Sequence, residues 1–341
     1  MKNGLERIDK ILRKAVKGFG LTLTEALFLL RTEGKDFDKL IQASFKFSTK
    51  KTRGIIRFYE KAFPPVSLTG YECELDCNHC KKHYLMHMTP TETPTKLVKV
   101  CEGFHKKGIK GVLLSGGSRK NGVVPLDSFL DAIKTVKKRF NMFIEAHTGP
   151  INHETSKLLV EAGLDAFLPD VVGDEETPQK VYGLNLGPKT YETMLKGMVK
   201  AGIKNISPHV CVGLNFGKVG SEVNALKLIS KFNPTVVVIT VFIPTPGTPM
   251  ENVPPPRPED VAKTIAIANL MFPKTPVSLG CVRPGGTHRD LVDRLAVKVG
   301  VSKIAVPSRS AYKEAERLGL KVKVFHQNMC CCAEEVEKTL K

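Results

Sequence analysis

No stretch of the 341-residue sequence is apolar enough to cross a membrane. A membrane-spanning helix needs roughly 18 or more apolar residues in a row. The longest apolar run, at residues 236–243, is a short series of β-branched residues typical of a strand. The first residues also lack the basic, then apolar, then small order of a secretion signal. We therefore expect a cytoplasmic protein that is not held in a membrane.

Low-complexity linkers and internal repeats are also missing, and no aromatic stacking motif or recognition-helix pattern accompanies the net charge of +18. The surplus charge therefore does not by itself indicate nucleic acid, and we do not expect a nucleic-acid partner. Its densest patch is Lys50, Lys51 and Arg53. An acidic protein partner or a solvated lysine-rich surface explains the charge equally well.

The nine cysteines are an odd number in close groups, which favours a reducing compartment and metal binding over disulfides. Cys73, Cys77 and Cys80 form a C-x3-C-x2-C pattern directly after an apolar run at 66–68 that predicts a strand. Three thiolates on one loop can hold three irons of a 4Fe–4S cluster and leave the fourth open for a substrate. A zinc site would usually show two C-x2-C pairs, and only one is present.

The rest of the chain alternates between strand and helix patterns. Residues 1–62 are predicted to be helical, with Thr22 and Glu25 as a capping box. The predicted strands are 66–68, 111–114, 142–146, 166–168, 206–212, 235–243, 277–279 and 303–306. Eight β/α units in about 260 residues predict an α/β protein of the TIM-type (β/α)8 class, although an open doubly wound sheet remains possible. We expect an N-terminal helical extension at 1–62, a barrel at 63–326, and a cysteine-bearing tail at 327–341 that covers the barrel mouth.

The active site of such a barrel lies at the C-terminal ends of its strands, and several unusual residues are predicted there. The candidates for cofactor binding are Gly116, Gly117, Ser118, Glu145, His147, Asp170 and Gly213. The glycine pair permits close backbone approach to a ligand, or simply a tight turn. A carboxylate such as Glu145 or Asp170 can hydrogen-bond a bound cofactor, or can be only solvated.

A second group of cysteines includes three residues near the end of the chain. Cys330, Cys331 and Cys332 form a triplet, and Cys281 and Cys211 follow the seventh and fifth predicted strands. If the tail folds back over the barrel, these residues offer five soft ligands to a site that needs about four. The pattern predicts an auxiliary iron–sulfur cluster. The alternatives are a frayed tail with surface thiols, and cysteines buried as small apolar residues.

The cysteine loop and the Gly116-Gly117 pair resemble the radical S-adenosylmethionine (SAM) superfamily. The resemblance implies that Cys73, Cys77 and Cys80 hold a 4Fe–4S cluster whose open iron binds SAM, and that one electron then releases a 5′-deoxyadenosyl radical. It also implies that the glycine backbone receives the methionyl amine. His79 takes the place of an aromatic residue near the adenine. Ser118 departs from the Glu that often follows the glycines in this family.

Within that superfamily the chain resembles biotin synthase, through the helical prefix, the Val210-Cys211 segment and residues 242–249. Biotin synthase has further cluster cysteines after its second and third barrel strands, where this chain has Ser118 and His147. It also uses an arginine near the position of Arg283 as an unusual cluster ligand. The terminal cysteine triplet looks like a replacement for the missing cysteines. This combination resembles the two-part lipoyl synthases of archaea.

That resemblance implies an auxiliary 4Fe–4S cluster as the sulfur donor, held by Cys281, Cys330, Cys331 and Cys332, with Cys211 in reserve. The substrate would be octanoyl-lysine on a small acidic lipoyl carrier protein, with sulfur inserted at carbon 6 or 8. A partner radical SAM subunit and an external electron donor are implied as well, and positive charge would help the carrier to dock. The alternatives are a biotin synthase-like or other single-cluster radical SAM enzyme, and a basic RNA-binding or metal-carrier protein without catalysis.

Overall fold

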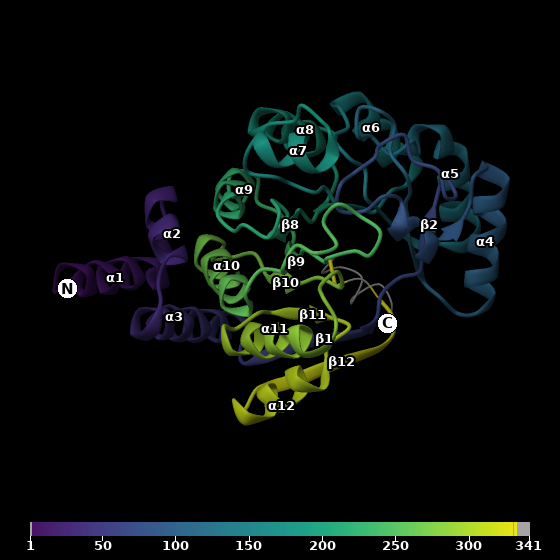
Figure 1. Ribbon diagram of the computed structural model, residues 1–341. Helices are drawn as coiled ribbons and strands as arrows, with labels where there is room; N and C mark the ends of the chain where they lie inside the picture. The colour runs from purple at the N-terminus through teal and green to yellow at the C-terminus, as the bar shows by residue number, and fades with distance from the viewer. Residues whose placement is uncertain (1, 330, 333–341) are drawn as a thin grey trace.

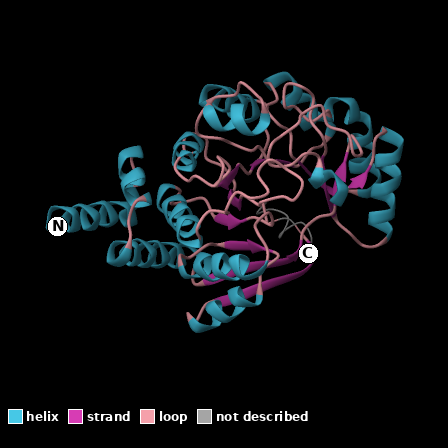
Figure 2. Cartoon of the chain, in the orientation of Figure 1, coloured by secondary structure: helices cyan, strands magenta, loops and turns pink. Residues whose placement is uncertain are grey.

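Parallel strands surrounded by helices form the body of the molecule, and α1, α2 and α3 project from one side of it (Figure 1, Figure 2). The computed structural model describes residues 2–329 and 331–332. The helices are α1 (Lys2–Lys14), α2 (Leu23–Leu30), α3 (Gly34–Thr52), α4 (Pro94–Lys106), α5 (Leu130–Phe140), α6 (His153–Ala162), α7 (Glu176–Tyr182), α8 (Pro188–Lys200), α9 (Ser221–Ile229), α10 (Pro258–Met271), α11 (Gly286–Lys298) and α12 (Arg309–Arg317), with short helical turns η1 (Ala15–Phe19), η2 (His83–His87) and η3 (Leu126–Phe129).

The strands form two six-stranded sheets in which the neighbouring strands run parallel. The strands are β1 (Ile55–Lys61), β2 (Pro65–Ser67), β3 (Thr89–Pro90), β4 (Gly111–Ser115), β5 (Phe143–Ala146), β6 (Ala166–Phe167), β7 (Asn205–Ile206), β8 (His209–Val212), β9 (Val237–Val241), β10 (Val277–Leu279), β11 (Lys303–Ala305) and β12 (Lys321–Asn328). Their spatial orders are β12-β1-β11-β10-β9-β8 and β3-β2-β4-β5-β6-β7. Strands that alternate with helices are expected to pair in this way, because each helix carries the chain back to the start of the next strand.

The two sheets are joined at both seams by chain segments that leave one sheet and enter the other. At one seam β1 pairs with β11, and its continuation β2 pairs with β4. The N–H of Leu113 also donates to the carbonyl of Pro64, at 3.1 Å. At the other seam β7 pairs with β6, β8 pairs with β9, and a parallel bridge joins Asp170 to His209. The two sheets are therefore the halves of a TIM-type barrel, as the strand–helix alternation predicts.

The apolar core has two layers, because successive side chains of a strand point to opposite faces. On β9, Val237 and Ile239 belong to the layer between strands and helices, whereas Val238 faces the barrel interior. The interior cluster consists of Tyr59, Phe63, Ala166, Leu168, Val236, Val238, Ala305, Met329, Cys331 and Cys332. The described part of the C-terminal tail therefore lies among the inward-facing side chains of the strands. The prediction that the tail covers the barrel mouth also depends on residues 333–341. These residues lie outside the described part of the chain.

The N-terminal extension packs against the outside of the barrel, where its helix α3 contacts α10. Ser44 on α3 accepts a hydrogen bond from Asn269 and donates one to the Val299 carbonyl. Lys263 on α10 is buried and ion-pairs with Glu33, just before α3, at 3.1 Å. The predicted capping box is confirmed, because Thr22 and Glu25 exchange both of its hydrogen bonds at the start of α2. The extension is thus fixed to the barrel by buried polar contacts as well as by apolar packing.

Two predictions about the elements are wrong in part. Residues 55–61 belong to strand β1 and not to the helical prefix. The fifth predicted strand, 206–212, is divided into β7 and β8. The other predicted strands are present within a few residues of their expected ends. The boundaries of the three expected units stay a prediction.

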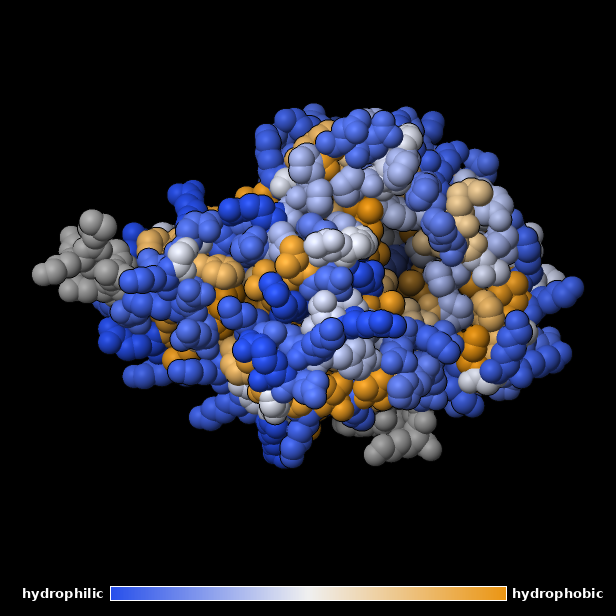
Figure 3. Space-filling model, turned by 60° about the horizontal axis from the view of Figure 1, so that its bottom comes forward, coloured by the Kyte–Doolittle hydropathy of each residue, from blue (hydrophilic) through white to orange (hydrophobic). Residues whose placement is uncertain are grey.

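Hydrophilic side chains cover most of the face that Figure 3 draws, and hydrophobic ones gather around a hollow near its middle. Among the residues that the structure describes, no helix has the length and apolar character needed to span a membrane.

Candidate active site

The three cysteines of the C-x3-C-x2-C loop lie where the chain leaves β2, at the C-terminal end of the barrel strands. Their side chains are all partly buried. The N–H groups of Cys80 and Lys81 both donate to the carbonyl of Cys77, at 3.1 and 3.0 Å, and this turn brings Cys77 and Cys80 together. Burial raises the pKa of the Cys77 thiol to about 12, and the nearby Cys80 and Cys73 raise it further. The three sulfur atoms are therefore close enough to interact.

The loop after β4 clamps the cysteine loop in place. A Cβ atom at Gly117 would lie 1.9 Å from the carbonyl oxygen of Glu72 and 2.7 Å from the Cα of Cys73, so only glycine fits there. The N–H of Gly117 donates to Thr69 Oγ1 at 2.7 Å, and the N–H of Ser118 donates to Cys73 Sγ at 3.2 Å. Gly116 has a φ of 147°. The glycine pair thus has a role in seating the cysteine loop, and its contact with a methionyl amine stays a prediction.

His79 lies beside two tyrosine rings, with its centroid 5.4 Å from that of Tyr182 and 6.2 Å from that of Tyr84. Burial lowers the pKa of His79 to about 4, so the imidazole is neutral at physiological pH. Among the described residues its Nδ1 has no hydrogen-bond partner. A neutral ring in an aromatic setting suits the predicted place near an adenine.

Three polar side chains gather at the strand ends across the second seam. The His147 Nδ1 lies 2.9 Å from the carbonyl oxygen of Leu168 and 3.8 Å from Asp170 Oδ2. The rings of His147 and His209 have centroids 5.0 Å apart. Burial lowers the pKa of His209 to about 3, and the nearby His147 adds to this shift. Burial raises the pKa of Asp170, although His147 opposes the rise. The predicted site residues His147 and Asp170 therefore share one polar group with His209.

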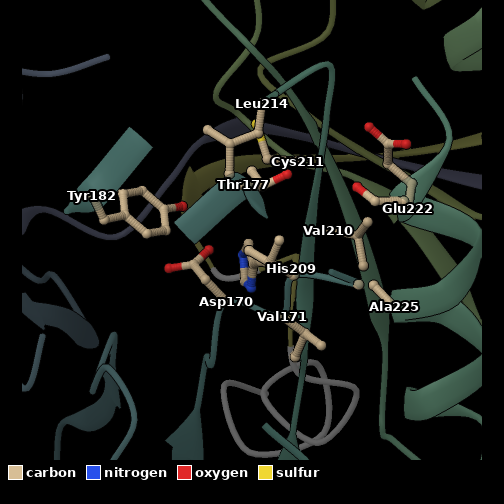
Figure 4. A pocket seen from close by; sticks show the side chains of 13 residues that line it. Asp170, Val171, Thr177, Tyr182, His209, Val210, Cys211, Leu214, Glu222 and Ala225 are labelled. Atoms are coloured by element: carbon tan, nitrogen blue, oxygen red, sulfur yellow. The ribbon is translucent and has the colours of Figure 1, made fainter. Parts of the chain in front are cut away.

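A small pocket opens beside this group. Asp170 faces it from the segment after β6, Tyr182 from the end of α7, and His209 and Cys211 from β8 (Figure 4). The fifth-strand segment contributes Val210, Cys211 and Leu214 to its wall. The contact of this segment with an adenine stays a prediction. Gly213 has a φ of 79°, and its N–H donates to the buried Glu222 at 2.8 Å, so it forms the turn behind the wall.

The described tail cysteines lie deep in the barrel. Both Cys331 and Cys332 are buried, and their Sγ atoms are 3.8 Å apart. The Sγ of Cys332 is 3.9 Å from His209 Nε2, and its carbonyl accepts a hydrogen bond from the Ser207 hydroxyl. Hydrogen bonding with Cys332, helped by the charge of Lys303, outweighs burial and lowers the pKa of the Cys331 thiol to about 7.

The remaining candidate cysteines divide between two places. The Cys281 side chain is exposed, yet surrounding protein raises the pKa of its thiol and the nearby Cys331 raises it further, so it sits in a hollow within reach of the tail. Cys211 instead faces the pocket, where burial raises the pKa of its thiol to about 12. Cys330 lies outside the described residues. The structure thus brings Cys331 and Cys332 together, with Cys281 within electrostatic reach of Cys331, whereas Cys211 lines the pocket.

Sequence comparison places the chain near one group of enzymes. No family model matches the sequence. The chain is 22% identical to the biotin synthase of Clostridium acetobutylicum over 80% of this chain and 83% of that protein. It is 24% identical to the biotin synthase of Geotalea daltonii over 86% of each. A third match, to the biotin synthase of Ruthia magnifica, is 28% identical and spans 40% of this chain but only 42% of that protein.

Solved structures show the same fold. Methylornithine synthase (PylB) superposes with a TM-score of 0.65 at 18% identity, over 92% of this chain and 97% of that one. HydG, a maturase of the [FeFe]-hydrogenase, superposes with a TM-score of 0.68 at 19% identity, over 100% of this chain and 82% of that one. In sequence the chain is similar to biotin synthases, and in fold it is similar to these two enzymes. These likenesses support a radical SAM enzyme of the biotin synthase type, and they imply a 4Fe–4S cluster and SAM.

The donor set fits the cluster that a radical SAM protein carries. Among the described residues, no three His, Cys, Asp or Glu side chains are arranged to hold a single metal ion. A 4Fe–4S cluster makes a different demand, because each thiolate binds its own iron and the sulfur atoms do not converge on one point. Three partly buried thiols within electrostatic reach of one another, on a loop fixed by Gly117, match this demand.

The biotin synthase-like interpretation of Arg283 needs a correction. Arg283 and Asp293 form an ion pair in which both side chains are fully buried, with Nε 2.7 Å from Asp293 Oδ1. Its other nitrogens donate to the carbonyls of Gly280, Ala305 and Val306 and to the second Asp293 oxygen. The guanidinium therefore holds the ends of β10 and β11 together and has no donor directed at a cluster. It is a structural residue in this radical SAM protein.

Sequence reasoning missed three residues that the structure places at the site. His209 was noted only as part of a strand, yet it stands between the pocket and Cys332. Tyr182 ends α7 and reaches the pocket from outside the barrel strands. Lys303 is a fully buried lysine on β11 beside the tail. The period-two pattern of a strand could have indicated that Lys303 faces inward with Ala305, but only if the register of β11 were known.

Proposed function

We propose that this enzyme inserts sulfur into unactivated C–H bonds, and that it is a lipoyl synthase subunit acting at carbon 6 or 8 of protein-bound octanoyl-lysine. The observation that carries the proposal is a second group of thiols, Cys281, Cys331 and Cys332, in the same barrel as the C-x3-C-x2-C loop but separate from it. We assign these thiols to an auxiliary 4Fe–4S cluster. Cys330 is the proposed fourth ligand, and Cys211 is the reserve.

Each group of residues has a defined task in this proposal. Cys73, Cys77 and Cys80 hold the SAM-binding cluster, and Gly117 keeps their loop seated. When bound, this cluster supplies the electron that splits SAM, and the auxiliary cluster supplies the sulfide that is inserted. In the proposal the neutral His79 and the pocket wall around Cys211 receive the adenine, and Asp170 and the buried Glu145 are the proposed partners of the ribose or methionyl part.

An octanoyl chain needs an apolar path to the two groups of thiols. The interior cluster supplies apolar walls from β1, β6, β9 and β11. Its burial keeps water away from a carbon radical, which would otherwise meet competing donors. Carbons 6 and 8 have no acidity that a general base could use, so proton abstraction by His147 or Glu145 is not a workable route. The chain's own residues therefore orient the substrate and exclude water.

The proposed macromolecular partners are an acidic lipoyl carrier, a second radical SAM subunit and an external electron donor. The net charge of +18 favours an acidic carrier. The densest basic patch, Lys50, Lys51 and Arg53, ends α3 and precedes β1, so it lies at the N-terminal end of the barrel strands. A carrier that delivers its lysine arm to the mouth would instead meet the surface around the cysteine loop, where Lys120 is exposed.

The test begins with iron and sulfide counts on protein prepared without oxygen. Two clusters give about eight irons per chain, and replacing Cys73, Cys77 and Cys80 with Ala should leave about four. The loaded enzyme is then incubated with reductant, SAM and an octanoylated carrier, and the carrier is examined by mass spectrometry for added sulfur. A carrier with a free lysine is the matched control. About four irons in the parent protein, or none in the triple variant, would contradict the proposal.

A second candidate substrate is a small molecule, because the aligned relatives are biotin synthases. The same loaded enzyme should be given the biotin precursor in place of the carrier. Sulfur in the small molecule and none in the octanoyl arm would move the assignment to a biotin synthase-type reaction. In both cases 5′-deoxyadenosine formation reports radical generation independently of the substrate.

A further inference from the structure

A fully buried lysine stands inside the barrel next to the tail cysteines. Lys303, the first residue of β11, has an exposed fraction of 0%. Its neighbours in register are Arg57 on β1 and Ser278 on β10. Among the described residues its Nζ has no hydrogen-bond partner and no ion-pair partner. Lys263 on α10 is also buried, but it has both hydrogen-bond and ion-pair partners, because it pairs with Asp260 and Glu33.

An ammonium in this position calls for a negative charge that the described chain does not provide. Burial of a lone ammonium is strongly unfavourable unless an anion and hydrogen-bond acceptors compensate for the lost water. Among the described residues, Lys303 Nζ has a cation–π contact with the ring of Tyr59, whose centroid lies 5.7 Å away, at the outer limit for such a contact.

The nearest anion source along the chain is the tail. The Cys331 thiol belongs to the same interior cluster as Tyr59, the ring that lies 5.7 Å from Lys303 Nζ, and the positive charge of Lys303 acts on this thiol. A 4Fe–4S cluster with its thiolate ligands is an anion, and its sulfur atoms accept hydrogen bonds. The chain has thus placed a donor without an acceptor beside the thiols that we assign to such a cluster.

We propose that the Lys303 ammonium is the counter-charge and hydrogen-bond donor of the auxiliary cluster, directed at the sulfur of Cys331 or at a cluster sulfide. The inference rests on the proposed function, because it needs that cluster. It assigns Lys303 a tuning task, since a nearby positive charge favours the more negative, reduced form of a cluster and raises its midpoint potential. Insertion of sulfur into carbon leaves electrons on the cluster, so a raised potential favours that step.

The experiment measures the midpoint potential of the auxiliary cluster alone. Cys73, Cys77 and Cys80 are replaced with Ala, so that only the auxiliary cluster remains, and the protein is titrated electrochemically with EPR detection. In this background Lys303→Gln and Lys303→Met should move the midpoint to a more negative potential, and Lys303→Arg should leave it near the parent value. Lys263→Met is the matched control, because it also removes a buried lysine but one far from the tail, and it should not move the midpoint.

A second measurement separates tuning from a structural role. Without the cluster, Lys303→Met should keep or raise the melting temperature, because it removes an uncompensated buried charge. Loading of the cluster should raise the melting temperature of this variant by less than it raises the melting temperature of the parent protein. A midpoint that is unchanged in both Gln and Met variants would overturn the role of Lys303. So would a Met variant that is destabilised equally with and without the cluster, or that fails to fold.

The two proposals fail in different ways. If the triple cysteine variant binds no iron, the auxiliary cluster itself is absent and the proposed function fails before Lys303 is tested. If that variant binds about four irons and the midpoint does not respond to Lys303, the proposed function stands and only the role of Lys303 is lost.

Discussion

Replacing Asp293 with Asn should destabilise the protein more than almost any other single polar change. Both side chains of the Arg283–Asp293 pair are fully buried, and Asp293 Oδ2 also accepts from the N–H of Ser308 at 2.7 Å. Loss of one partner leaves the guanidinium charge buried without compensation, which costs about 3–5 kcal/mol. Asn keeps the shape of Asp but offers a single acceptor oxygen, so it cannot satisfy both Nε and Nη2.

Urea unfolding of the cluster-free protein, under anaerobic conditions at pH 7, measures this cost. We expect the free energy of unfolding of Asp293→Asn to fall by about 3–5 kcal/mol at an unchanged m value. Arg283→Lys should be as costly, because an ammonium cannot reach the Asp293 carboxylate and the carbonyls of Gly280, Ala305 and Val306 together, and each buried carbonyl without a donor costs about 1–3 kcal/mol.

The control is Arg289→Gln. Arg289 lies on α11, as Asp293 does, and it donates to the Val306 carbonyl that Arg283 also contacts. Its position is more exposed, so its loss should cost less than about 1 kcal/mol. A loss of less than about 1 kcal/mol for Asp293→Asn would refute the structural reading of the pair. A changed cluster EPR signal in folded Arg283→Lys, with little change in stability, would instead restore Arg283 as a cluster ligand.

The remaining predictions concern the cysteines, the glycine loop and acid stability. Cys77→Ala should abolish 5′-deoxyadenosine formation, whereas Cys331→Ala should keep it and stop sulfur insertion. Equal loss of cleavage in both would contradict the division between the two groups of thiols. Gly117→Ala should prevent loading of the SAM-binding cluster, seen as a loss of about four irons, because its Cβ would overlap the Glu72 carbonyl. Burial alone would raise the pKa of Asp260, but hydrogen bonds from two basic neighbours outweigh it and hold that pKa below its usual value. Its stabilisation is therefore present at pH 7 and is lost as the pH falls through the folded-state pKa. Asp260→Asn should cost about 1 kcal/mol at pH 7 and much less near pH 3, and a cost independent of pH would argue against an ionic contribution.

The barrel could be predicted from the sequence because its signals are local. The run 277–279 forms β10 as predicted, and the capping box of Thr22 and Glu25 depends on residues three apart. Strand β1 could not be identified in the same way. Its partners β11 and β12 lie more than 200 residues further along the chain, and strand formation depends on such neighbours more than on composition.

The break between β7 and β8 has a local cause that the sequence did display. Pro208 has no N–H to donate, so the ladder cannot continue through it, and the strand changes partners at that point. The consequence for the site was not predictable. The change of partners places His209 at the seam, where it meets both His147 and Cys332.

The cysteine loop was recognisable because its three ligands lie within eight residues of one another. The second group of thiols depends on contacts between Cys281 and a tail some 50 residues downstream, so the sequence could only suggest it. The role of Arg283 could not be taken from the resemblance for a related reason. A resemblance fixes the type of residue at a position, but the buried Asp293 ten residues later decides what the guanidinium does.

The position of Met329, Cys331 and Cys332 has a consequence for the order in which the protein matures. These residues follow every barrel strand in the chain, yet they end inside the ring that those strands form. On the ribosome the walls of the barrel emerge before the residues that fill it. The barrel can therefore close around an interior that still lacks Cys331 and Cys332, and the burial of these two thiols becomes a late step of folding that depends on insertion of the tail.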